Sequence, residues 1–167
     1  MEEKFLQEEE AAAERNLQFL TRRDLNSPTS AKQFVVFDVQ LLNGKSTFGE
    51  LEKLKSRKII DQLFKEGKSV SINGFTLVYL IQPLQTFYPA QAGFSVPKKF
   101  FKHAVDRNRV KRLMREVYRT HKINLYQKLA TDKKQMALMF IYKGKALPEY
   151  ELVSKSVIHC LNRLIKA

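Results

Sequence analysis

Cysteine is almost absent from this 167-residue chain, which contains Cys160 and no other. A single cysteine cannot form an internal disulfide, and it cannot supply the several thiolates of a structural zinc site. Cys160 lies in an apolar helical pattern, where a free cysteine is usually a small buried side chain. The sequence therefore excludes a disulfide-stabilised scaffold and a thiolate metal cluster.

Long apolar runs are also missing. No run approaches the roughly 20 residues that a membrane-spanning helix needs. The N-terminal stretch "MEEKFLQEEE" is acidic and lacks the basic and apolar regions of a secretory signal. We therefore expect a cytoplasmic protein with no membrane partner.

Acidic residues are scarce relative to basic ones. Lys and Arg total 30 against 17 Asp and Glu, which gives a formal net charge of +13 and favours a polyanionic partner such as nucleic acid. Residues 1–46 hold eight acids and six bases, whereas residues 47–167 hold nine acids and 24 bases, a net charge of +15. The binding surface is therefore expected in residues 47–167.

The uneven charge suggests an N-terminal extension (1–46) followed by one domain (47–167). Helix-forming residues at the start of the extension are interrupted by "NSPTS", which is typical of a linker. The segment 34–42, "FVVFDVQLL", has the composition of a strand, but a single strand is not stable alone, so its state stays open. We expect the extension to be flexible or partly helical and dispensable for nucleic-acid binding.

Hydrophobic periodicity and turn residues indicate the elements of the domain. Asn73-Gly74 between two strand-like segments is typical of a tight hairpin, and Gly67 is a natural helix end. The predicted elements are a helix (51–67), three strands (69–72, 75–83 and 91–97), a helix (104–122), a strand (136–142) and a helix (147–166). This order predicts an α+β sandwich, a single small domain with helices packed on a four-stranded sheet.

The helix predicted over residues 104–122, "AVDRNRVKRLMREVYRTHK", carries seven bases and two acids. Four apolar residues share one arc of the helical wheel and can pack on the sheet: Val110, Leu113, Met114 and Val117. The opposite arc and its flanks carry Arg107, Asn108, Arg109, Lys111, Arg112, Arg115 and Arg119. The preceding loop adds Lys98, Lys99 and Lys102. We therefore expect the apolar face to pack on the sheet and the basic face to bind a polyanion.

A charged helix face can also be merely solvated, but such faces usually interleave both signs. Crowded like charges repel one another, so a neutralising partner is favoured, and Arg forks with an Asn suit phosphate and ribose. Composition alone leaves RNA and DNA open. The strand and Pro-Lys-Lys loop before this helix differ from a helix-turn-helix, and they favour backbone and shape recognition, as is common with folded RNA.

Two motifs resemble one known family. The stretch "FSVPKKFFKHAVDRNRVKRLMREVYR" resembles the signature of the bacterial ribonuclease P protein subunit, with its Arg-Asn-Arg motif at residues 107–109. The stretch "LKSRKIIDQLFKEGKSV" resembles that family's first helix and the turn after it. The resemblance spans about residues 48–166, and it implies a fold like the second domain of ribosomal protein S5.

The resemblance also implies a function. Ribonuclease P removes the 5′ leader of precursor tRNA by metal-dependent hydrolysis of one phosphodiester, and in bacteria its catalytic site is on a large RNA. The protein would be a subunit that binds this catalytic RNA and precursor tRNA. Mg²⁺ would be held mainly by the RNA, with no organic cofactor and no obligate protein partner. A stand-alone RNA-binding or ribosomal protein and a protein-only nuclease are the rival hypotheses.

The resemblance assigns two RNA-binding sites. The catalytic RNA would contact Lys98, Lys99, Lys102, Arg107, Asn108, Arg109, Lys111, Arg112 and Arg115. A cleft between the first helix and the sheet would hold the single-stranded leader. Its expected contacts are Lys55, Arg57, Phe64 and Tyr79, with core packing or ordinary surface charge as their alternative roles.

The leader cleft departs from the family pattern at two positions. Ile60 stands where the family often carries an aromatic residue one turn before Phe64. The family's strand tyrosine falls nearest Val78, so that assigning its role to Tyr79 requires a shift of one residue, which reverses the face of the strand.

The sequence predicts no catalytic residue and no metal ligand on the protein itself. A metal-dependent nuclease needs clustered carboxylates or histidines. The nine acids of residues 47–167 are spread along the chain, as are His103, His121 and His159. The protein is therefore expected to be inactive alone.

Overall fold

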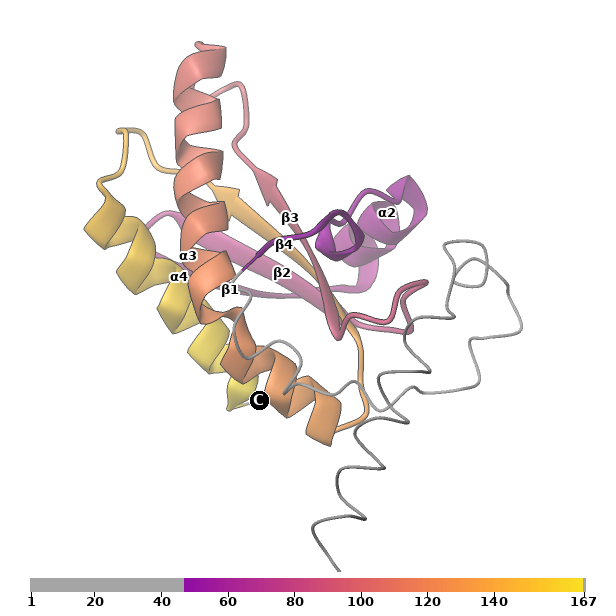
Figure 1. Cartoon of the computed structure of the whole chain (residues 1–167). Coiled ribbons are helices and arrows are strands. Elements are labelled where there is room, and N and C mark those ends of the chain that lie inside the picture. The colour runs from indigo at the N-terminus through magenta and orange to yellow at the C-terminus, as the bar shows by residue number, and fades with distance from the viewer. Residues whose placement is uncertain (1–46, 167) are drawn as a thin grey trace, which may run out of the picture. The chain divides into compact units, whose positions relative to one another are not determined.

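The structure, a computed structural model, describes residues 47–166. Our predictions for residues 1–46, including the strand-like segment 34–42, concern positions outside this range. The described elements are the short 3₁₀ helix η4 (Glu50–Glu52), α2 (Arg57–Glu66), β1 (Lys68–Ile72), β2 (Phe75–Ile81), β3 (Ala90–Ser95), α3 (Ala104–Thr131), β4 (Met136–Tyr142) and α4 (Tyr150–Ile165). Their order confirms the predicted α+β fold (Figure 1).

The four strands form one mixed sheet in the order β1-β2-β4-β3. The β1–β2 hairpin turns at Asn73 and Gly74, whose positive φ angles of 49° and 79° suit a two-residue hairpin turn. Strand β3 pairs in parallel with β4, and α3 is the crossover that a parallel pair requires. All seven residues of β4 are buried, as expected for an apolar run between two neighbouring strands.

Helices cover both faces of the sheet (Figure 1). On one face α3 and α4 pack over alternate residues such as Leu77, Leu138 and Phe140. On the other face α2 places the fully buried Leu63 against Val78 and Met139 and their neighbours. The side-chain alternation of the strands therefore decides which residues belong to which face.

Helix α2 begins later than predicted, at Arg57 rather than near residue 51. The segment before it forms hydrogen bonds with β3 instead of continuing as a helix, because the N–H of Leu54 donates to the carbonyl of Ala92 at 3.1 Å. Lys53 also forms an isolated parallel bridge with Ala92. Residues 53–56 are therefore not helical, contrary to the prediction, and residues 51 and 52 belong to the separate 3₁₀ helix η4.

Helix α3 is longer than predicted and continues to Thr131. The residues after 122 look polar on average, yet Leu125, Tyr126 and Leu129 recur at helical spacing and are almost completely buried. These three side chains extend the packing stripe of the helix. The segment between the predicted helix and β4, to which the sequence assigned no element, is thus mostly helix.

A buried ion pair connects α3 to the segment before α2. Lys122 and Glu52 are each 1% exposed, and the Lys122 ammonium group bonds the Glu52 carboxylate. The same carboxylate accepts the hydroxyl of Tyr126 at 2.8 Å and the backbone N–H of Gly49 at 2.6 Å. Lys122 also donates to the carbonyl of Thr47 at 2.5 Å. The network therefore holds the approach to α2 against α3.

Cys160 is buried in α4, as the apolar pattern predicted. Burial raises the pKa of its thiol to about 11, because the thiolate would lose its hydration there. Within residues 47–166, none of the helices is both long and apolar enough to span a membrane.

Candidate RNA interface

The first half of α3 has the predicted packing face. Val110, Met114 and Val117 are completely buried against the sheet, and Leu113 is partly buried. The opposite side of the helix exposes Asn108, Arg109, Arg112 and Arg115 and leaves Lys111 half-buried. The division into a packing face and a polar face is therefore confirmed.

Arg107 is turned toward its own chain. Its Nη1 donates hydrogen bonds to the carbonyl oxygens of Phe101 at 2.9 Å and Lys102 at 2.6 Å. These bonds fasten the end of the basic loop to the first turn of α3. Arg107 thus positions the loop, whereas Arg109, two residues later, is exposed.

The loop between β3 and α3 exposes Lys98, Lys99 and Lys102. The N–H of Phe100 donates to the carbonyl of Pro97 at 3.2 Å, and the Lys99 ammonium group lies 5.0 Å from the centre of the Phe100 ring. Because Arg107 holds the loop's end, these lysines lie beside the N-terminus of α3. The structure therefore brings the loop and the helix together, as predicted.

Arg115 and Arg119 mark where the exposed positive surface ends along α3. The Arg115 guanidinium lies 5.9 Å from the centre of the Phe94 ring on β3. Arg119 forms two hydrogen bonds with the carboxylate of Glu116, at 3.0 and 2.5 Å. The bonded guanidinium lowers the pKa of Glu116. Arg119 is thus partly neutralised by an acid one turn away.

Most of the predicted catalytic-RNA contacts form one positive surface whose cations are not paired with acids. We call this the basic surface. Among residues 47–166, no ion pair involves its cations, which are Lys98, Lys99, Lys102, Arg109, Lys111, Arg112 and Arg115. Such a concentration of like charge attracts polyanions and releases their counterions on binding.

Two predicted leader contacts share one exposed stripe of α2. Arg57 and Phe64 are seven residues apart, which places them on the same side of an α-helix. The Phe64 side chain is 54% exposed, so core packing does not account for it. Ile60, between them, is half-buried and packs against the core on the α2 side. This stripe offers one aromatic ring and one guanidinium to solvent.

Lys55 lies outside α2 and before it. Its ammonium group pairs with the carboxylate of Glu50, and both side chains are more than 60% exposed (63% and 62%). The prediction that Lys55 sits on the same helix as Phe64 is wrong, because the helix begins at Arg57. Lys55 still lies in the segment that leads directly into α2.

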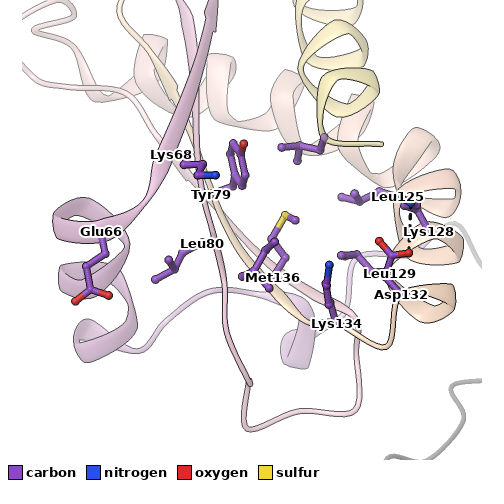
Figure 2. A pocket seen from close by; sticks show the side chains of 12 residues that line it. Glu66, Lys68, Tyr79, Leu80, Leu125, Lys128, Leu129, Asp132, Lys134 and Met136 are labelled. Carbon is purple, nitrogen blue, oxygen red and sulfur yellow. Dashed lines mark ion pairs between the residues drawn. The ribbon is translucent and has the colours of Figure 1, made fainter. Parts of the chain in front are cut away.

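Tyr79 does not share a face of the sheet with Phe64. Its side chain packs against the core beneath α3 and α4, while Val78 faces α2 and is 8% exposed. Figure 2 shows Tyr79 at a pocket with Leu125 and Met136. The expectation that Tyr79 lines a cleft with Phe64 is therefore contradicted, because adjacent strand residues point to opposite faces.

The pocket that contains Tyr79 lies near the C-terminal end of α3 and has a volume of about 450 Å³ (Figure 2). Its walls are largely apolar, and its rim carries charges of both signs, including the Lys128–Asp132 ion pair at 3.3 Å. The mixed charge of its rim distinguishes this pocket from the basic surface, so we do not assign an RNA-binding role to it.

Sequence reasoning missed the side chains that hold the interface in place. Arg107, which is predicted to bind RNA, also bonds its own loop, and Phe101 packs against Tyr142 with ring centres 5.9 Å apart. Glu52 looked like one acid in an amphipathic helix, yet it is buried against Lys122. No local signal could reveal the last pair, because its members are 70 residues apart.

Across residues 47–166, no group of three or more His, Cys, Asp or Glu side chains is arranged to hold a metal ion. Buried Glu52 already bonds Lys122, and Glu116 and Glu151 are paired with basic neighbours. The described donor set therefore does not fit a protein-bound magnesium ion.

Comparison with known proteins identifies the family. A family model described as "Ribonuclease P" matches residues 48–165, most of the chain. The chain belongs to this family. The resemblance drawn from the Arg-Asn-Arg motif is thereby confirmed.

Curated relatives in the ribonuclease P family cover most of this chain. It is 35% identical over 126 residues to the ribonuclease P protein component of Chlorobaculum tepidum, covering 70% of this chain and 80% of the relative. It is 32% identical over 125 residues to that of Porphyromonas gingivalis, covering 74% and 91%. These matches cover far more of the chain than the two motifs do.

Solved structures of the same family have a similar fold. The ribonuclease P protein of Thermotoga maritima matches with a TM-score of 0.55 at 25% identity, over 67% of this chain and 96% of that one. The protein of Staphylococcus aureus matches with a TM-score of 0.55 at 22% identity, over 67% and 94%, which supports the fold alone. The α+β fold with a four-stranded mixed sheet is thus shared with ribonuclease P proteins.

Proposed function

We propose that this ribonuclease P family protein binds the catalytic RNA of ribonuclease P and the 5′ leader of precursor tRNA. In this role it assists the magnesium-dependent endonucleolytic removal of the leader, which produces the mature 5′ end of tRNA. The observation that carries the proposal is the basic surface, whose seven cations have no acidic partner within residues 47–166. The proposal places the protein in the cytoplasm, where precursor tRNA is processed.

In this proposal the basic surface holds the catalytic RNA. Its cations lie on one helix face and one adjoining loop, so they can follow a folded phosphate backbone. Asn108 adds a donor and an acceptor suited to a ribose hydroxyl. Each phosphate that is neutralised contributes a slope of about −0.7 to −0.9 to the dependence of log affinity on log salt. Binding should therefore weaken steeply as the salt concentration rises.

The exposed stripe of α2 is proposed to hold the leader. Phe64 can stack on a base of single-stranded RNA, an interaction worth about 1–3 kcal/mol. Arg57 lies on the same side of the helix and can contact a neighbouring phosphate, and Lys55 lies just before the helix. Stacking and phosphate contacts tolerate many sequences, as a protein that meets many different leaders requires.

Catalysis is proposed to occur on the RNA partner. Magnesium bound there would stabilise the charge that develops at the scissile phosphate. The protein's own residues would neutralise nearby RNA phosphates, which lowers their mutual repulsion and lets the folded RNA form at a lower magnesium concentration. In this proposal no side chain of the protein is catalytic.

Reconstitution at low magnesium tests the proposal. Catalytic RNA is assayed for removal of the leader from precursor tRNA with and without the protein, and the protein is expected to restore cleavage. Equal cleavage with and without protein would overturn the proposal and favour a stand-alone RNA-binding protein. Cleavage by the protein without catalytic RNA would favour a protein-only nuclease.

A matched pair of variants makes the test specific to the basic surface. Arg109→Glu/Arg112→Glu is expected to abolish the stimulation at low magnesium. Arg163→Glu/Lys166→Glu makes the same change in net charge at the C-terminal end of α4, where both residues are exposed, and should leave the stimulation intact. Equal effects of the two pairs would argue for attraction by net charge without a defined surface.

A further inference from the structure

We propose that the loop after β4, residues 143–146, is a second part of the catalytic-RNA interface, in which Lys143 and Lys145 bind RNA phosphates. The inference rests on the proposed function and adds two contacts that neither the basic helix nor the Arg-Asn-Arg motif contains. The observation behind it is the position of this loop beside the loop that carries Lys98, Lys99 and Lys102.

The parallel pairing of β3 and β4 brings the two loops to one end of the sheet. Ser95, the last residue of β3, is paired with Ile141, next to the end of β4. Two parallel strands in this register release the chain at the same sheet end. Figure 1 shows the connections from β3 to α3 and from β4 to α4 starting at the same end of the sheet. Segments about 45 residues apart in sequence are thus neighbours in space.

Side-chain contacts join the two loops directly. The ring of Phe101 in the first loop stacks on Tyr142 at the end of β4, with ring centres 5.9 Å apart, and the two residues are 7% and 3% exposed. The Tyr142 hydroxyl donates to the carbonyl of Ala146 in the second loop at 2.8 Å. Because Arg107 bonds the carbonyl of Phe101, these contacts run from the first turn of α3 to residue 146.

The backbone of the second loop is closely packed. The N–H of Lys143 donates to the carbonyl of Gly74 in the β1–β2 hairpin at 2.7 Å. A Cβ atom on Gly144 would collide with the hydroxyl and ring of Tyr142, so this position has no room for a side chain. Lys143 and Lys145 therefore extend from a loop of defined shape, which reduces the entropy lost on binding.

The charge of the second loop matches that of the first. Lys143 and Lys145 are exposed, and no ion pair in residues 47–166 involves either of them. Glu151, in the first turn of α4, is paired with Lys155 at 2.7 Å. A polyanion that lies across the first loop would meet further positive charge here. Because lysines act as point charges, they suit phosphates and carry no base preference.

The salt dependence of RNA binding tests this proposal. In the full chain, Lys143→Gln/Lys145→Gln is compared with wild type for affinity to the catalytic RNA over a series of salt concentrations. Loss of two phosphate contacts should reduce the magnitude of the log–log slope by about 1.4–1.8. Lys143→Arg/Lys145→Arg should keep the wild-type slope, and so should Arg163→Gln/Lys166→Gln at the far end of α4.

An unchanged slope in Lys143→Gln/Lys145→Gln would overturn the inference while leaving the proposed function intact. Failure of the wild-type protein to bind the catalytic RNA would overturn both. Thermal unfolding followed by circular dichroism checks that each variant is folded. A reduced slope in a variant that unfolds like wild type supports the inference.

Site-directed cross-linking provides a positional test. A photoreactive group is attached at Lys99→Cys or Lys145→Cys, and the buried Cys160, whose thiol pKa is raised to about 11, should react slowly. Both probes are expected to label neighbouring nucleotides of the catalytic RNA. Labelling by the first probe and none by the second would place Lys145 outside the interface and overturn the proposal.

Discussion

The first half of α3, residues 104–119, exposes Arg109, Arg112 and Arg115 to solvent, whereas Lys122 in the second half is buried. Arg109 and Arg112 have no acidic partner within residues 47–166, but Lys122 is paired with Glu52 at 1% exposure. Both halves belong to one helix with the same sign of charge. A basic residue in this helix therefore acquires its role from what the fold places beside it. Lys122 is held in a buried ion pair, whereas the exposed cations are the ones proposed to bind RNA.

The largest expected effect is a loss of stability when Lys122, in the second half of α3, is replaced. Lys122→Met leaves the Glu52 carboxylate buried without its counter-charge, which should lower the free energy of unfolding by about 3–5 kcal/mol. Urea denaturation at neutral pH measures the change. The double variant Lys122→Met/Glu52→Leu removes both charges and should recover much of the stability. Equal destabilisation in the single and double variants would show that the ion pair is not the cause.

The next effect separates two neighbouring arginines of the exposed half. Arg107→Gln removes two charge-assisted bonds to loop carbonyls and should lower the free energy of unfolding by about 1–3 kcal/mol. Arg109→Gln should leave stability within about 0.5 kcal/mol of wild type. Denaturation and RNA-binding curves measured on both variants check the contrast. If Arg109→Gln alone were destabilising, the assignment of Arg107 as the loop's anchor would be wrong.

The two aromatic residues predicted to contact the leader differ in the same way, because Phe64 is exposed and Tyr79 packs against the core. Phe64→Ala should weaken binding of precursor tRNA by the holoenzyme by about 1–3 kcal/mol, through loss of base stacking. Its binding of tRNA that has no leader should not change. Tyr79→Ala should leave the leader's contribution intact, because this side chain packs beneath α3 and α4. A leader-specific loss in Tyr79→Ala would contradict this placement.

The smallest effect on RNA affinity is expected at Glu116, near the boundary between the two halves of α3. Glu116→Gln removes the carboxylate paired with Arg119 and should raise RNA affinity slightly, by less than Arg109→Gln lowers it. The pKa of Glu116 is lowered in the folded state, so its contribution to stability is present at neutral pH. This contribution is lost as the pH falls through the lowered pKa. Comparing acid titrations of wild type and Glu116→Gln should show only a small difference.

The fold was predictable where local pattern determines local structure. The Asn73-Gly74 hairpin, the apolar run of β4 and the packing arc Val110–Met114–Val117 all follow from residues close in sequence. The start of α2 was not predictable, because Leu54 bonds Ala92 of β3 and Glu52 bonds Lys122. These long-range partners prevent residues 53–56 from continuing as a helix, although their apolar spacing is helical.

The candidate site was predictable as a set of exposed cations but not in its detailed roles. Arg107 and Arg109 flank the polar arc on opposite sides of a helical wheel, and only the loop's position reveals that Arg107 bonds two carbonyls. Tyr79 was assigned to the wrong side because adjacent strand residues face opposite ways, and a one-residue shift changes the layer. The charge of Lys143 and Lys145 was visible in sequence, but their neighbours depend on the parallel pairing of β3 and β4.

The position of β4 in the sheet also affects the order in which the protein can form during synthesis. Strand β4 lies between β2 and β3, so β3 has no sheet neighbour until residues 136–142 have been made. Helix α3 needs mainly local contacts and can form earlier, since chains fold as they emerge from the N-terminus. A nascent chain that ends before residue 136 thus carries the basic helix with Val110, Met114 and Val117 still uncovered by the complete sheet. The ribosome must deliver residues 136–142 before the helix that carries the basic surface acquires its full support.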